Sequence, residues 1–263
     1  MIQFFRRIRQ NLLSEGKTGK YLKYAIGEIV LVVIGILIAL QINNWNEQNK
    51  ADRVENVFLK RLLVDLNKDK AYLESIHSRR ENQIRAAKAI IDFSIETKID
   101  SIIYQLPNML TISSWQETTS NQNTFLELMS SGNLNIIKSD SIKDGLLSLD
   151  RSYKSLINDD KTNKEPYVSN LWPAADLIDP YNYLVLEPNL NKEFRINERL
   201  KPSEIENMII ALKQDFKKVL DSRKFRSGLM NAMDSYERSL PEIESMIKQV
   251  ESLITRIEIE IKK

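Results

Sequence analysis

Hydrophobic residues follow three different patterns along this chain of 263 residues. Residues 25–42 form an almost continuous apolar run, AIGEIVLVVIGILIALQI, in which Glu28 is the one ionisable residue and Gln41 the one amide. Residues 47–96 and 229–261 instead place apolar residues at steps of three and four, the spacing of one face of an α-helix. We therefore predict an all-α chain: one N-terminal transmembrane helix continues into a long helical hairpin or coiled-coil stalk, with a distal cap of shorter helices.

The apolar run has the length of a membrane span. Its 18 residues rise about 27 Å as an α-helix, close to the roughly 30 Å hydrocarbon thickness of a bilayer. Tyr21 and Tyr24 precede the run and Trp45 follows it, where interfacial aromatic anchors are expected. A transmembrane helix over residues 25–45 is predicted. The alternatives are a buried helix of a soluble core and a cleaved signal peptide, but the run is longer than a usual signal core and lacks a clean small-residue cleavage site.

Charge is distributed unevenly about this run. Residues 1–24 carry six basic residues against Glu15, a net charge of +5, whereas the whole chain carries +2. Basic segments tend to stay in the cytoplasm. We therefore expect an uncleaved signal anchor in the inner (cytoplasmic) membrane, with a cytoplasmic tail over residues 1–24 and a periplasmic helical domain over residues 46–263.

The tail itself has an amphipathic pattern. Arg6, Arg7 and Arg9 accompany apolar residues at helical spacing, which predicts a short helix lying on an anionic lipid surface. A basic arm that binds a protein partner is the alternative. In either case membrane lipid is an expected partner.

Three residues inside the span fall near one helical face: Glu28, Gly35 and Ala39. The spacing Gly35-x-x-x-Ala39 allows a second helix to approach closely. Two interpretations stay open. Glu28 can reach back to the membrane interface, or the three residues form a helix-packing stripe in which Glu28 is protonated or paired.

The C-terminal pattern is the most regular. Apolar residues step alternately by four and three, as in a coiled-coil seam, and the predicted seam consists of Leu240, Ile243, Ile247, Val250, Ile254, Ile257 and Ile261. The spacing does not decide whether this seam pairs with residues 47–96 of the same chain or with another chain. Pro241 follows a possible Ser239–Glu242 capping box, which predicts a kink or a restart at residue 239. Residues 47–96 carry their own interruptions at Asp69, Arg80 and Gln83.

Glycine, proline and capping residues predict the shorter elements. Five prolines lie between residues 166 and 202, which predicts an irregular window. Three further helices are expected: residues 124–130 ending at a left-handed Gly132, a helix after Ser139 or Asp140, and a helix opened by a Ser203–Glu206 capping box. The turn Ser131–Gly132–Asn133 is a possible contact turn for a partner, and helix punctuation is the alternative.

Composition excludes several kinds of chemistry. The chain has no cysteine, which excludes disulfides, Cys-ligated zinc, iron–sulfur clusters and a thiol nucleophile. His77 is its one histidine, and no phosphate-binding glycine motif occurs. We therefore expect no enzymatic activity, no catalytic residue, no cofactor and no metal. Since residues 25–263 sum to −3, nucleic acid is not an expected partner either.

Two segments resemble a known family. Residues 4–47, FFRRIRQNLLSEGKTGKYLKYAIGEIVLVVIGILIALQINNWNE, closely resemble the N-terminal signature of an uncharacterised single-span membrane protein family of Bacteroidota. Residues 123–149, NTFLELMSSGNLNIIKSDSIKDGLLSL, resemble its second marker. The family is a domain of unknown function, so the resemblance implies an inner-membrane anchor and supplies no reaction or ligand.

These observations lead to one principal functional expectation. The chain is expected to be a membrane-anchored extracytoplasmic interaction protein, an oligomeric scaffold or accessory subunit of an envelope complex, with a homo-oligomeric or a membrane or periplasmic protein partner. A periplasmic ligand-sensing or solute-binding module is an alternative. A single-span subunit of an ion-driven or transport assembly that uses Glu28 is the other.

Overall fold

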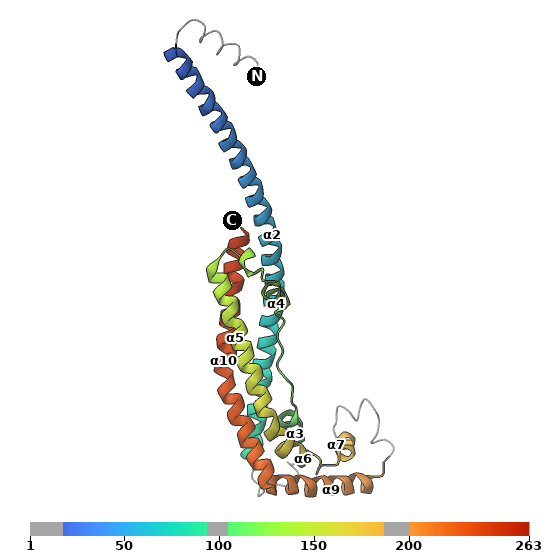
Figure 1. Ribbon diagram of the computed structural model, residues 1–263. Coiled ribbons are helices and arrows are strands. Elements are labelled where there is room, and N and C mark those ends of the chain that lie inside the picture. The colour runs from blue at the N-terminus through green and yellow to red at the C-terminus, as the bar shows by residue number, and fades with distance from the viewer. Residues whose placement is uncertain (1–17, 94–104, 187–199, 263) are drawn as a thin grey trace. The chain divides into compact units, whose positions relative to one another are not determined.

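The computed structural model describes residues 18–93, 105–186 and 200–262 (Figure 1). Every regular element in these ranges is helical, and no strand occurs in them. The predicted all-α class is therefore confirmed. The chain divides into two compact units, residues 1–57 and 58–263.

The longest element is α2, Thr18–Ile91, a single helix of 74 residues. It contains the whole predicted span and most of the helix predicted over residues 47–96. The observed helix ends at Ile91. No proline or glycine separates the two stretches between residues 43 and 52, so nothing in the backbone chemistry stops the helix there. The apolar stretch is long and hydrophobic enough to cross a membrane: its best 18-residue window has a mean hydropathy of 2.6 and no residue buried within the chain.

The second unit is built on three long helices. These are residues 58–91 of α2, α5 (Asp140–Pro166) and α10 (Arg223–Ile261). Cross-helix ion pairs show that α10 runs antiparallel to α2: Lys70 meets Glu251 at 2.7 Å, and Lys88 meets Glu237 at 2.9 Å. In Figure 1, α5 and α10 also lie side by side, and a Gly145 Cβ would come within 2.6 Å of the Leu253 side chain.

Two hydrophobic clusters follow each other along α10. The first joins residues 59–76 of α2, α4 (Asn123–Ser130), α5 and residues 243–257 of α10. The second joins residues 84–90 of α2, α3 (Leu106–Ser113), residues 225–236 of α10 and α9 (Pro202–Asp221). α9 leads directly into α10, whose N-cap Ser222 accepts the Phe225 N–H at 3.3 Å.

The proline-rich window is mostly helical where the structure describes it, contrary to the prediction, with a turn at residues 176–179. A π-helical turn, η3 (Tyr167–Leu171), is followed by α6 (Trp172–Ala175) and α7 (Pro180–Leu186). The prolines stand at helix ends: Pro166 closes α5, and Pro180 and Pro202 open α7 and α9. In a first turn the missing proline N–H has no carbonyl to bond, so these helices lose nothing.

The predicted restart at residue 239 and the predicted N-cap at Ser203 differ from the structure. α10 continues through Pro241 without a restart, and the Ser239 hydroxyl donates back to the Tyr236 carbonyl at 2.9 Å instead of capping a new helix. α9 begins at Pro202, where the Glu204 carboxylate accepts the Lys201 N–H at 2.7 Å. The N-cap therefore lies two residues earlier than predicted, because proline fixes the first helical position. Only the glutamate half of a capping box forms, since the Lys201 side chain has no acceptor atom.

Candidate functional site

The predicted contact turn lies at the end of α4 and has the hydrogen bonds of a Schellman motif. Asn133 N–H donates to the Leu128 carbonyl at 2.8 Å, and Gly132 N–H donates to Met129 at 3.2 Å. Gly132 has φ +70°, the left-handed conformation that the motif requires. The helix 124–130 and its glycine cap are confirmed, and the side chains of residues 131–133 are exposed.

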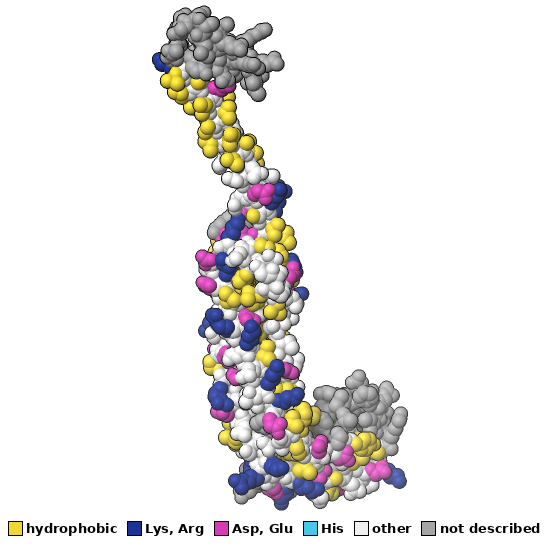
Figure 2. Space-filling model, in the orientation of Figure 1, with side chains coloured by type: hydrophobic (Ala, Val, Ile, Leu, Met, Phe, Trp, Pro, Cys, Tyr) yellow, Lys and Arg dark blue, Asp and Glu magenta, His cyan; other side chains and the backbone are white. Residues whose placement is uncertain are grey.

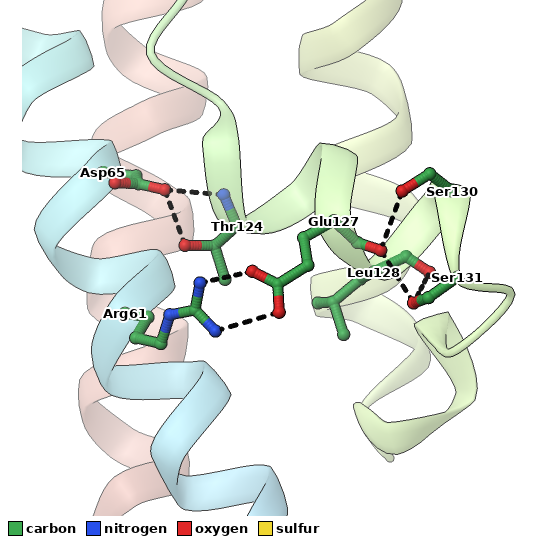
Figure 3. A network of polar contacts seen from close by, with 7 residues as sticks. All are labelled: Arg61, Asp65, Thr124, Glu127, Leu128, Ser130 and Ser131. Atoms are coloured by element: carbon green, nitrogen blue, oxygen red, sulfur yellow. Dashed lines mark hydrogen bonds and ion pairs between the residues drawn. The ribbon is translucent and has the colours of Figure 1, made fainter.

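α4 is docked on α2 by polar contacts (Figure 3). The Asp65 carboxylate accepts both the Thr124 N–H, at 2.8 Å, and the Thr124 hydroxyl, at 2.7 Å. Gln122, the N-cap residue, makes no side-chain cap bond, so α2 supplies the cap for α4 from another part of the chain. One carboxylate therefore fixes where α4 begins.

A second contact lies one helical turn earlier on α2. Arg61 and Glu127 form a two-pronged ion pair, with Nη1 to Oε1 at 3.2 Å and a shorter second contact. The Arg61 hydrogen bond lowers the pKa of the Glu127 carboxyl and, in return, Glu127 raises the pKa of Arg61. Both side chains are about half exposed, so this pair orients α4 more than it stabilises the fold.

Residues 114–122, here called the strap, join α3 to α4 without regular structure. An extended segment cannot satisfy its own N–H groups, and side chains from two helices accept three of them. These bonds are Thr118 N–H to Asp160 Oδ2 at 3.2 Å, Thr119 N–H to the Tyr72 hydroxyl at 3.0 Å and Asn121 N–H to Asp69 Oδ1 at 3.0 Å. The Gln83 amide holds the start of the strap by donating to the Ser114 carbonyl at 2.8 Å.

The polar interruptions noted in the sequence therefore share one role. Asp69 and Gln83 bond to the strap directly, and Arg80 donates to Asp160, the acceptor for Thr118, at 2.7 Å. All three side chains on α2 are buried. A buried polar group costs free energy unless it is hydrogen-bonded. These three residues therefore favour the strap conformation in which their hydrogen bonds form.

One buried carboxylate remains incompletely satisfied. Asp69 Oδ2 and the Tyr153 hydroxyl on α5 are both buried without a hydrogen bond of normal geometry. Burial raises the pKa of Asp69, against the opposing effects of the Asn121 N–H and the nearby Tyr153 hydroxyl. Burial also raises the pKa of Tyr153, to which the nearby Asp69 charge contributes. The charged form of Asp69 is therefore destabilised by its burial in the first cluster.

A polar cavity of about 280 Å³ lies between α5 and α10, with Arg80 of α2 in its lining. Asp159 and Asp160 come from α5, and Arg238 and Glu242 come from α10. Burial raises the pKa of Glu242, and the Asp159 charge adds to the shift. Beside the cavity, the hydroxyls of Tyr167 and Tyr236 contact each other, and burial raises the pKa of Tyr236 to about 12.

The predicted seam of α10 lies partly in the core. Ile243, Val250 and Ile257 are fully buried, whereas Leu240, Ile247, Ile254 and Ile261 are half-buried. Met246 and Leu253, which the prediction left out, are buried as well. The stripe is wider than a two-helix seam because α10 packs against both α2 and α5, and it packs inside a single chain.

The predicted membrane residues lie in the first unit. Gly35 and Ala39 are exposed, Glu28 is half-buried, and Trp45 is exposed. No atom of the chain lies within 4 Å of the position a Gly35 Cβ would take. Arg6, Arg7 and Arg9 fall outside the described residues, as do the side chains of Tyr21 and Tyr24.

The described residues contain no group of three or more His, Asp or Glu side chains placed to hold a metal ion. His77 lies between Glu244, at 3.3 Å, and Glu81, at 3.7 Å. These contacts connect α2 with α10 and leave His77 in a structural position.

Sequence reasoning missed the acceptors that place the strap and α4. Asp65 and Tyr72 were not singled out, although Asp65 stands one helical turn before Asp69 on α2. That i, i+4 spacing of two carboxylates on a helix face was the available signal. Their partners, at residues 119–124, are about 50 residues away and follow no local pattern.

Comparison with known protein families places part of the chain in a family. A family model described as "Family of unknown function (DUF6090)" matches residues 28–170, a stretch that includes most of α2, all of α4 and all of α5. No curated protein and no solved structure matches the chain.

Proposed function

Because the chain belongs to this family of unknown function, its relatives supply no activity, and we propose from its own residues that it is a membrane-anchored helical interaction protein. It acts as an oligomeric scaffold or as an accessory subunit of an envelope complex. The apolar span anchors it in the inner membrane, the N-terminus is cytoplasmic, and the second unit is periplasmic. No part of this role requires a reaction.

The observation that carries the proposal is the uncovered apolar surface of α2. Across the best 18-residue window none of the residues is buried within the chain. Figure 2 shows this stretch as a surface of hydrophobic side chains with few charges. A patch of this size is unfavourable in water. Lipid, or lipid together with another transmembrane helix, would cover this apolar surface.

The proposed partner contacts are not on the α10 stripe. That stripe packs against α2 and α5 of the same chain, so it is not available to contact a partner. Two surfaces remain for a partner: the Glu28, Gly35 and Ala39 face of the span, and the exposed turn at residues 131–133. The Gly35 face supports close helix approach, since nothing in the chain lies against it.

Blue-native sizing of the full-length protein, extracted in mild detergent, tests the interaction role. A photo-crosslinker at position 36 of the span should trap a partner, and one at position 131 tests the contact turn. A second copy or a co-purifying protein is expected. A strictly monomeric protein without a crosslinked product at either position would contradict the proposal.

The orientation has a separate test, made simple by the absence of cysteine. Single substitutions Ser14→Cys and Ser131→Cys can be labelled in intact spheroplasts with a membrane-impermeant maleimide. The proposal predicts labelling at position 131 and protection at position 14 until the membrane is opened. The reverse pattern would overturn the orientation and leave the anchor intact.

A further inference from the structure

The cavity between α5 and α10 combines acidic and basic side chains in its lining. All nine lining residues are polar or charged, and they come from α2, α5 and α10. A volume of about 280 Å³ exceeds what a single water molecule needs and suits a small solute. Such a surface favours a hydrophilic ligand, because every side chain that lines it carries a polar or charged group.

Basic groups line part of this cavity. Arg80 is only 5% exposed and donates from Nη2 to Asp160 Oδ1 at 2.7 Å. A guanidinium has five N–H donors, so this one bond leaves Arg80 able to hold a second acceptor. Arg238 pairs with Asp234 at 3.0 Å, but both side chains are largely exposed, so a ligand can replace that weak contact.

Acidic groups line another part. Asp159 and Glu242 have no salt-bridge partner among the described residues. Glu242 is half-buried, and the raised pKa described above reflects this burial and the neighbouring Asp159 charge. A positive group placed between these carboxylates would relieve both the desolvation and the repulsion.

The cavity therefore offers donors for an anion and acceptors for a cation within one small volume. We propose that it binds a small zwitterionic solute, whose carboxylate meets Arg80 and Arg238 and whose ammonium meets Asp159 and Glu242. Free amino acids and short peptides belong to this class. The described residues lack the set of three metal ligands that a divalent cation would require.

Asp160 connects this site to the strap. Its Oδ1 accepts from Arg80, and its Oδ2 accepts the Thr118 N–H at 3.2 Å. A carboxylate that binds Arg80 therefore acts on the residue pair that holds the strap. The site goes beyond the proposed anchoring role and does not depend on it.

The experiment uses the full chain in detergent and three probes: L-alanine, L-alaninamide and N-acetyl-L-alanine. Ligand-observed NMR gives each Kd. L-alanine is expected to bind, and each blocked probe is expected to bind about tenfold more weakly or worse, because each lacks one of the two charged groups that the site holds. Equal binding of L-alaninamide would leave only a cation site, and equal binding of N-acetyl-L-alanine only an anion site. Either result, or no binding by L-alanine at millimolar concentration, would overturn the proposal.

Variants locate the binding. Glu242→Gln and Arg238→Gln should each weaken L-alanine binding about tenfold. Glu258→Gln, on an exposed turn of the same helix away from the cavity, is the matched control and should change nothing. Unfolding midpoints of all variants verify that they fold. Equal Kd values for Glu242→Gln and Glu258→Gln would show that the solute binds elsewhere and refute the assignment.

Discussion

Two stretches of α2 use apolar residues in opposite ways. Residues 25–42 are apolar on all sides and are not covered by the chain, whereas residues 58–91 are apolar on one face that is buried against α5, α10 and the shorter helices. Each stretch carries a carboxylate among its apolar residues, Glu28 in the first and Asp69 in the second. The difference teaches that the arrangement of polar residues around a helix, more than the number of apolar ones, decides which environment it requires.

The largest expected effect on stability is tested by replacing a leucine by alanine in each of the two stretches. Leu73 is fully buried and Leu37 is 58% exposed. Leu73→Ala should lower the free energy of unfolding of the second unit by about 2–5 kcal/mol, because it leaves a cavity in the first cluster. Leu37→Ala should leave that free energy unchanged. Urea denaturation followed by circular dichroism measures both, and equal losses would contradict the two-unit description.

The glycines give the next comparison. Gly→Ala inside a helix normally stabilises by about 1 kcal/mol. At Gly228 the new Cβ would lie 2.8 Å from Asn170 Cβ, so Gly228→Ala should instead destabilise by about 1–3 kcal/mol through overpacking. Gly35→Ala meets no atom of the chain and should not alter the stability of the second unit. The same denaturation measures this variant. A stabilised Gly228→Ala variant would show that η3 can shift to accommodate the added methyl group, which would contradict the prediction.

The buried carboxylate offers a smaller, pH-dependent effect. Burial raises the pKa of Asp69 in the folded state above its unfolded value near 3.9, so the folded state holds the proton more tightly. This contribution is present below the unfolded pKa and is lost as pH rises through the folded pKa. Asp69→Asn keeps an oxygen acceptor for Asn121 N–H and removes the charge.

The Asp69→Asn variant should therefore be more stable than the parent at pH 7, by about 1 kcal/mol, and the advantage should shrink toward pH 4. Denaturation at a series of pH values tests the sign. A variant less stable at pH 7 would mean that the charged bond to the strap outweighs the cost of burial. Glu28→Gln is the comparison in the span and should leave this pH profile unchanged.

The smallest expected effect concerns the surface ion pair on α4. Glu127→Gln removes the charge that pairs with Arg61, and both side chains are exposed. The unfolding midpoint should stay within experimental error, and faster amide exchange should be confined to α4. A large loss of stability would show that the ion pair, and not the Asp65 cap, holds α4 on α2.

Much of the helical architecture could be read from local patterns. The α4 helix, its left-handed Gly132 and the helix after Ser139 depend on interactions within a few residues, and each was predicted. The face of α10 was harder. Leu253 was assigned to no seam, whereas Ile254 was, because a strict heptad pattern does not tell which flank of the stripe a third helix covers.

The candidate sites show the same division. The sequence by itself determined an all-α chain, a stretch apolar enough to span a membrane and polar interruptions of the apolar face at Asp69, Arg80 and Gln83. Only the tertiary structure decided that these residues hold the strap, that Asp65 caps a helix some 60 residues away, and that Arg80 and Glu242 share a cavity. Helical periodicity is a local property of the chain, whereas the partner of a buried polar group is set by the packing of distant segments.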